Sequence, residues 1–168
     1  MKRNKSLIGI DIFSGAGGLS LGAGMAGISV RYGVEINKYA AASFAYNHKN
    51  AEVLTGDITK IKTSELNLDN QEVFVIMGGP PCQGFSMSNT MSRNMDNDKN
   101  FLYLEFVRFV RELKPKWFVL ENVWGLTKMN DGETLDMIKE SFEALGYIVK
   151  ADILWANNYG VTQKRYRC

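Results

Sequence analysis

A cysteine on a stiff turn is the side chain in this sequence best suited to nucleophilic chemistry. Cys82 follows Pro80 and Pro81, and these prolines end an apolar run at 73–77 that is typical of a buried strand. Proline fixes φ and has no amide hydrogen for a sheet ladder, so the strand must stop and the turn is rigid. A thiol at the carboxyl end of a central strand can attack a substrate. Most free cysteines are instead small buried hydrophobes, and that alternative is open at this point.

A glycine-rich turn follows the first apolar run. Residues 7–13 indicate a strand, and a turn and a small-residue helix at 19–27 come next. This order is the entry to a nucleotide-binding βαβ unit, in which glycines let a ligand approach the backbone closely. A dinucleotide fingerprint would require glycine where this chain has Ser20. The glycines of the turn are Gly15, Gly17 and Gly18.

Three acids stand at the ends of further apolar runs. Glu35 lies 20 residues after Gly15, the spacing at which a βαβ unit places a carboxylate on ribose hydroxyls. A solvated acid at a strand end would show the same pattern. Asp57 and Glu121 also come just after runs of strand length. Because the carboxyl ends of parallel strands share one edge of a sheet, these acids, the glycine turn and Cys82 should line a single site.

Together these side chains suit methylation of a pyrimidine. A thiolate can add to an electron-poor ring carbon, and a carboxylic acid that protonates a ring nitrogen makes the ring more electrophilic. In cytosine, attack at carbon 6 turns carbon 5 into a carbanion-like centre that accepts a methyl group. Glu35 and Asp57 would then hold an adenosyl donor in place of a dinucleotide.

Alternating strands and helices should position these residues. The α/β order predicts a doubly wound, mostly parallel sheet in a single domain, 1–168. Residues 64–70 should form a turn or a short helix. Strands are expected at 7–13, 28–34, 52–54, 73–77, 117–120 and 147–155. Helices are expected at 19–27, 39–48 and 101–113, and a last helix should begin within residues 131–134 and end at Gly146.

Three further features each have two interpretations. The polar stretch 87–100 is either a lid over the nucleophile or a disordered loop, and we favour the lid. His48 stands near a helix end, where a cation suits the macrodipole, and we favour this role over catalysis. An apolar stripe on the helix at 101–113 is interpreted as core rather than as part of a cofactor site. The stripe consists of Phe101, Leu104, Val107, Val110 and Leu113.

Composition indicates a folded domain in a reducing compartment. Hydrophobic residues make up 45% and charged residues 23%, and no apolar run approaches the ~20 residues of a membrane helix. Asp11 interrupts the first apolar run, which argues against a signal peptide. Cys82 and Cys168 predict no disulfide, so we expect a cytoplasmic protein, nucleoid-associated if bacterial. A single histidine argues against a metal site, and a net charge of +2 neither requires nor forbids nucleic-acid binding.

Four segments in this order resemble the catalytic domain of the DNA (cytosine-5)-methyltransferases. Residues 11–18 are similar to the family's donor-binding motif, 80–83 to its nucleophile motif, 121–123 to its Glu-Asn-Val motif and 163–167 to its Gln-x-Arg-x-Arg motif. The resemblance implies a Rossmann-like methyltransferase fold, with S-adenosylmethionine as donor and S-adenosylhomocysteine as product. It also implies duplex DNA as substrate, a target base that flips out of the stack, and a setting such as restriction–modification.

The resemblance assigns a role to each matching residue. Four would be catalytic: Cys82, Glu121, Arg165 and Arg167. Nine would form the donor pocket: Phe13, Gly15, Gly17, Gly18, Glu35, Ile36, Asp57, Ile58 and Pro80. Phe13 would pack on the adenine, Glu35 would bind the ribose and Asp57 would bind the adenine amino group. Cys82 would be the attacking thiol, Glu121 would contact ring nitrogen 3, and the arginines would hold the site and the cytosine 2-oxo group.

The family continues beyond these motifs into a strand, a target-recognition domain and a returning segment. We therefore expect a fold that is incomplete at its C-terminus, a recognition domain in a longer or a second polypeptide, and no measurable methylation by this chain alone. Methylation of cytosine in RNA is an alternative, disfavoured because Ser86 stands where the RNA-acting branch has threonine. A catalytically inactive donor-binding or partner-binding remnant is another. A nicotinamide dehydrogenase is disfavoured by Ser20 and by the cysteine motif.

Overall fold

The computed structural model describes residues 6–69, 71–81 and 102–168, so Cys82, Phe101 and the predicted lid lie outside the described residues. The chain divides into two compact units. Unit 1 comprises Met1–Gly79 and Arg108–Leu120, and unit 2 comprises Pro80–Val107 and Glu121–Cys168. No helix within the described ranges combines the length and the apolar character needed to cross a membrane.

Unit 1 is built on a five-stranded sheet in which every paired neighbour is parallel. The strand order is β3-β2-β1-β4-β5, so the chain starts in the middle and winds outward in both directions. Residues 8–12 of β1 are all buried, and consecutive residues of a strand point to opposite faces, so both faces of this strand are covered. The strands are β1 (Leu7–Ile12), β2 (Ile28–Glu35), β3 (Glu52–Thr55), β4 (Val73–Gly78) and β5 (Trp117–Leu120).

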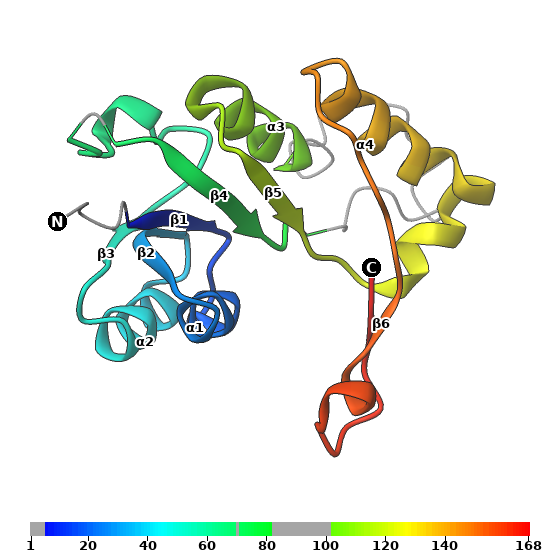
Figure 1. Cartoon of the computed structure of the whole chain (residues 1–168), viewed down its shortest axis with the longest axis horizontal. Coiled ribbons are helices and arrows are strands. Elements are labelled where there is room, and N and C mark those ends of the chain that lie inside the picture. The colour runs from blue at the N-terminus through cyan, green and yellow to red at the C-terminus, as the bar shows by residue number, and fades with distance from the viewer. Residues whose placement is uncertain (1–5, 70, 82–101) are drawn as a thin grey trace, which may run out of the picture. The chain divides into compact units, whose positions relative to one another are not determined.

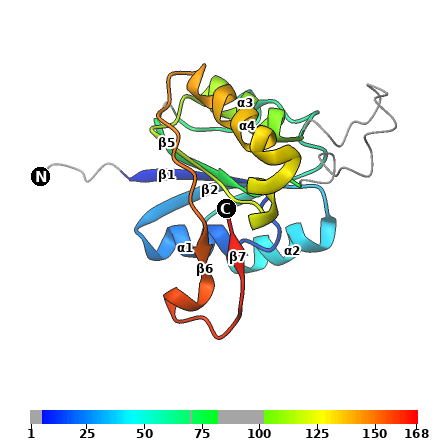
Figure 2. The ribbon, with the colours of Figure 1, turned by 90° about the vertical axis from the view of Figure 1, so that its right-hand side faces the viewer.

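Helices cover both faces of this sheet (Figure 1; Figure 2). Helices α1 (Gly18–Met25) and α2 (Lys38–Asn47) lie on one face. Residues 108–113 of α3 (Leu102–Leu113) lie on the other face. The Asn37 side chain caps α2 by accepting hydrogen bonds from two backbone N–H groups of its first turn. The predicted doubly wound α/β fold is therefore confirmed.

Unit 2 combines helices with a short antiparallel hairpin. The first half of α3 packs on α4 (Glu133–Glu143), where the Phe106 and Phe142 rings meet edge to face with centroids 5.8 Å apart. Strand β6 (Leu154–Trp155) pairs with β7 (Tyr166–Arg167). Short 3₁₀ helices occupy Trp124–Gly132 and Ala156–Tyr159 in this unit, and Thr63–Glu65 in unit 1.

The prediction of a strand at 147–155 is wrong over most of this range. The strand forms only at Leu154–Trp155, in the hairpin and not in the parallel sheet. A strand exists only where a partner supplies hydrogen bonds, and this pairing matches Leu154 with Arg167 in an antiparallel register. Within the described residues, that register leaves nothing opposite 147–152.

The buried face of α3 also differs from the prediction. Tyr103, Phe106 and Phe109 are at most 9% exposed, whereas Leu104, from the predicted stripe, is 38% exposed. Both stripes have helical spacing, so periodicity alone could not choose between them. The aromatic side chains occupy the buried face because they bury more apolar surface. Val110 belongs to both stripes and is fully buried.

Candidate active site

Two glycines of the turn after β1 have backbone conformations that favour glycine. Gly15 and Gly17 have positive φ angles of 55° and 92°, and a Cβ at Gly17 would collide with His48 Nε2. Gly18 has an ordinary φ, and a Cβ there would meet no described atom within 4 Å. Only the first two positions therefore need glycine for reasons within the described structure. Phe13, just before the turn, is half-buried with a φ of 60°.

Glu35 ties the end of β2 to this turn. Its Oε2 accepts a hydrogen bond from the Gly15 backbone N–H at 2.8 Å, and its Oε1 accepts one from the Asn37 N–H at 2.7 Å. A carboxylate can accept up to about four hydrogen bonds, so both oxygens keep capacity for a ligand. Ile36 beside it is 71% exposed and presents an open apolar surface.

Asp57 lies just past β3, at the same edge of the sheet. Its Oδ1 accepts hydrogen bonds from the Thr59 backbone N–H at 3.0 Å and the Thr59 hydroxyl at 2.8 Å. These bonds to Thr59 hold the pKa of the Asp57 carboxyl below its usual range. No described residue donates to the second oxygen, Oδ2, which leaves an anionic acceptor. Ile58 is buried, unlike Ile36, so its side chain belongs to the core.

Asp11 opens the predicted donor-binding motif, but sequence reasoning gave this acid no role of its own. It is fully buried in β1, and its Oδ2 accepts hydrogen bonds from the Ser20 hydroxyl at 2.6 Å and the Ser20 backbone N–H at 3.2 Å. Its Oδ1 has no partner among the described residues. Burial raises the pKa of Asp11 to about 6, with a further contribution from the Glu35 charge, although the Ser20 bonds oppose this rise. A charged residue inside an apolar run was the available signal.

His48 holds the turn from α2, which is more than the predicted role at the helix end. It is the residue that follows α2, and its backbone N–H bonds the Phe44 carbonyl. Its ring lies 4.6 Å from the Phe44 ring, and Nε2 lies 3.0 Å from the Gly17 carbonyl oxygen. A carbonyl only accepts, so Nε2 carries the hydrogen in this contact.

In unit 2, Glu121 is held by the C-terminal arginines. Arg167 Nε lies 2.6 Å from Glu121 Oε1, and Arg165 Nη2 lies 4.0 Å from the same oxygen. The Glu121 and Arg167 side chains are 32% and 28% exposed, so this ion pair is partly shielded from water. The Arg167 ion pair is close, whereas the Arg165 ion pair is at the outer limit for a direct contact.

Asn122 fixes the segments around Glu121 within unit 2. Its Nδ2 donates to the Pro80 carbonyl oxygen at 2.9 Å, and its backbone exchanges two hydrogen bonds with Cys168, at 2.7 and 2.9 Å. Asn122 is 6% exposed. These bonds bring the residues that precede Cys82 to the segment of Glu121. Cys168 is a free thiol, and burial raises its pKa.

The structure therefore assembles two groups of the predicted residues. Unit 1 brings together the glycine turn, Glu35 and Asp57 at the carboxyl ends of β1, β2 and β3. Unit 2 brings together Pro80, Glu121, Arg165 and Arg167. The role that sequence reasoning gave to each residue, including Cys82, stays a prediction. The contacts of His48 with Gly17 and of Asn122 with Pro80 were not predicted, because their partners are backbone carbonyls, which leave no mark in the sequence.

Comparison with known proteins gives consistent matches. Residues 7–168 match the family model of the C-5 cytosine-specific DNA methylases. Type II methyltransferase M1.HphI of Haemophilus parahaemolyticus is 44% identical over 165 residues, which are 96% of this chain and 44% of the relative. Type II methyltransferase M.AquIA of Picosynechococcus is 36% identical over 170 residues, 94% of this chain and 68% of the relative.

A solved structure shares the fold. The crystal structure of a protein described as a DNA modification methyltransferase encoded within an E. coli prophage superposes with a TM-score of 0.80 and 34% identity. The match covers 96% of this chain and 45% of that protein. This chain therefore spans less than half the length of M1.HphI and of the prophage protein.

Proposed function

The chain belongs to the C-5 cytosine-specific DNA methylases, and we propose that it carries the donor-binding and catalytic residues of an enzyme that methylates carbon 5 of cytosine in DNA. In this proposal residues 1–168 form the catalytic domain. Because M1.HphI and the prophage protein are more than twice as long as this chain, we also propose that target recognition is supplied by a longer form of this polypeptide or by a second one.

S-adenosylmethionine is the proposed donor, and four features of the described residues fit it. The free space at Gly18 leaves room for a ligand against the backbone, and the exposed Ile36 offers an apolar surface to an adenine ring. Glu35 has lone pairs left for ribose hydroxyls, and Asp57 Oδ2 can accept a hydrogen bond from the adenine amino group. When bound, this donor supplies a methyl group on a positively charged sulfur.

Cys82 is the proposed nucleophile. Its thiolate bonds to carbon 6 of a flipped-out cytosine, and the electron pair moves to carbon 5, which takes the methyl group. Loss of the carbon 5 proton and cleavage of the bond between sulfur and carbon 6 restore the aromatic ring. Glu121 interacts with ring nitrogen 3, and Arg165 and Arg167 orient Glu121 and bind the 2-oxo group.

The observation that carries this proposal is the hydrogen bond from Asn122 to Pro80. It joins the segment that leads into Cys82 to the segment that presents Glu121. A nucleophile and a proton-donating acid must reach the same ring, and a buried bond between their two segments supports that requirement. The Arg167–Glu121 ion pair adds a fixed orientation for the acid.

A trapping experiment tests the proposal. The complete enzyme, meaning this chain with the polypeptide that carries target recognition, is incubated with S-adenosylmethionine and duplex DNA containing 5-fluorocytosine. Fluorine cannot leave as a proton, so the covalent adduct should persist and mass spectrometry should locate it on Cys82. Cys82→Ser should form no adduct and should lose methyl transfer by at least about 10³-fold, while it still binds S-adenosylhomocysteine.

The controls separate the alternatives. Cys168→Ser should trap normally, because Cys168 has no proposed role in the reaction. An adduct with 5-fluorocytosine tRNA but not with DNA would move the substrate to RNA. Donor binding without any adduct would indicate that the protein is a binding module and not an enzyme. An adduct on another residue would show that Cys82 is not the nucleophile.

A further inference from the structure

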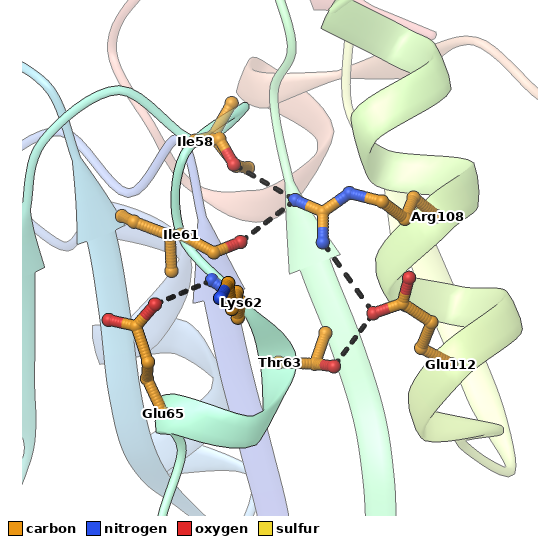
Figure 3. A network of polar contacts seen from close by, with 7 residues as sticks. All are labelled: Ile58, Ile61, Lys62, Thr63, Glu65, Arg108 and Glu112. Carbon is orange, nitrogen blue, oxygen red and sulfur yellow. Dashed lines mark hydrogen bonds and ion pairs between the residues drawn. The ribbon is translucent and has the colours of Figure 1, made fainter.

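A polar network outside the proposed site connects α3 to the loop that follows Asp57 (Figure 3). Arg108 Nη2 donates to the carbonyl oxygens of Ile58 at 2.9 Å and Ile61 at 3.0 Å. Arg108 Nη1 lies 3.5 Å from Glu112 Oε2, and the Thr63 hydroxyl donates to the same oxygen at 2.7 Å. One helix therefore contacts the loop through two side chains, all within unit 1.

The loop that Arg108 contacts begins with the proposed adenine-binding acid. Asp57 and Thr59 are joined by side-chain bonds, and the Lys60 N–H donates to the Asp57 carbonyl at 2.9 Å. The Ile61 N–H donates to the Ile58 carbonyl at 3.3 Å, so residues 57–61 form a compact turn. The position of Asp57 therefore depends on a turn whose carbonyl oxygens at Ile58 and Ile61 are hydrogen-bonded to Arg108.

Guanidinium chemistry suits this contact better than an ammonium would. The planar group spreads several N–H donors over a rigid fork, so it can bond two carbonyls and a carboxylate at once. The Arg108 side chain is only 20% exposed, which limits competition from water. Two backbone carbonyls of one turn are thereby held at a fixed distance from α3.

We propose that Arg108 is a positioning residue for the adenine side of the donor pocket, acting through the 57–61 turn on the Asp57 carboxylate. This inference rests on the proposed function, because it assumes that Asp57 binds the adenine amino group. Arg108 touches neither the donor nor the substrate in this proposal. Removal of the Arg108 guanidinium should allow the 57–61 turn to shift, so that the Asp57 carboxylate is less well oriented toward the adenine amino group.

The test compares two ligands that differ at the atom Asp57 is proposed to bind. S-adenosylhomocysteine offers an amino group to Asp57, whereas S-inosylhomocysteine offers a carbonyl oxygen that a carboxylate repels. Calorimetry on the complete enzyme should show that the wild type prefers the adenosyl ligand. Arg108→Met should bind the adenosyl ligand about tenfold more weakly, a loss typical of a charged hydrogen bond, and the inosyl ligand unchanged.

Arg111→Met is the matched control, since it removes the same charge from an exposed position of the same helix, and it should change neither affinity. Arg108→Lys keeps the charge and the stem but not the fork, so it should lose part of the preference. If Arg108→Met does not fold, the lysine variant decides. In the Asp57→Ala background, Arg108→Met should add no further loss.

Two results would overturn the inference. A wild-type preference that survives in both Arg108 variants would show that the turn holds Asp57 without this residue. Equal losses for both ligands would mean a general structural role. A wild type that binds neither ligand is a different failure, because it would remove the donor pocket of the proposed function together with this inference.

Discussion

Three acids near the glycine turn of unit 1 and the acid Glu121 of unit 2 are held by different kinds of group. Glu35, Asp57 and Asp11 each accept a hydrogen bond from at least one backbone N–H group of unit 1, and hydroxyl groups add a bond to Asp57 and to Asp11. Glu121 is held by the side chain of Arg167, which lies far along the sequence. Backbone donors are fixed once the sheet has formed, whereas an ion pair also depends on one side chain. The comparison predicts that the Glu121 site is the more easily broken of the two.

The largest effect should follow removal of the Arg167 guanidinium. Arg167→Met leaves Glu121 without its close partner, so methyl transfer by the complete enzyme should fall roughly 10²–10³-fold. Affinity for S-adenosylhomocysteine should stay unchanged, because backbone groups of unit 1 hold the proposed donor-binding acids. Lys164→Met removes an exposed charge nearby and serves as the control. Equal losses in both variants would mean that general charge, and not the ion pair, matters.

Asp11 should give unit 1 a stability that depends on pH. Its pKa is raised from 3.8 to about 6 in the folded protein, so the folded state binds a proton more tightly than the unfolded chain. The free energy of unfolding should therefore fall by up to about 3 kcal/mol through this group as the pH rises from about 4 to 7. Asp11→Asn keeps an acceptor for Ser20 and should abolish this contribution.

Urea unfolding at several pH values measures the effect of Asp11. The variant should gain stability over the wild type as the pH rises from 4 to 7, and the gain should level off above the folded-state pKa. Asp69→Asn, at a side chain that is 59% exposed, should show no comparable trend. A difference between Asp11→Asn and the wild type that is constant with pH would contradict the raised pKa.

Replacing Glu35 tests whether an acid held by the backbone also binds the ligand. Glu35→Ala should weaken S-adenosylmethionine binding by about 1–3 kcal/mol, the usual cost of losing hydrogen bonds to a charged group. Glu35→Gln should lose nearly as much, because its amide nitrogen cannot accept the N–H that one carboxylate oxygen now accepts. Calorimetry with the exposed Glu52→Gln as control checks this. Unchanged binding in Glu35→Ala would place the donor in another pocket.

The sequence was sufficient wherever structure follows from local signals. Short apolar runs ended by glycine, proline or an acid predicted the five parallel strands, and strand ends predicted the neighbourhood of the glycine turn, Glu35 and Asp57. These signals work because a buried parallel strand must be apolar and its carboxyl end must leave the sheet.

The predictions failed where distant partners decide. Residues 147–155 have strand-like composition, but only the part opposite β7 is paired. The choice of face on α3 depends on what packs against it, as Phe142 does against Phe106. The contacts of Asn122 and Arg108 with backbone carbonyls cannot be inferred from residue types, since every residue carries a carbonyl.

The smallest effect should come from His48, which supports the glycine turn from outside. Its Nε2 donates one hydrogen bond to the Gly17 carbonyl, and a typical hydrogen bond contributes about 1 kcal/mol. His48→Phe keeps a ring against Phe44 but has no donor, so donor affinity should fall about fivefold. His48→Gln retains an N–H donor and should recover most of that affinity. If phenylalanine binds the donor as well as histidine does, the turn is fixed by its own backbone bonds and Glu35, and the contrast between the two units becomes sharper.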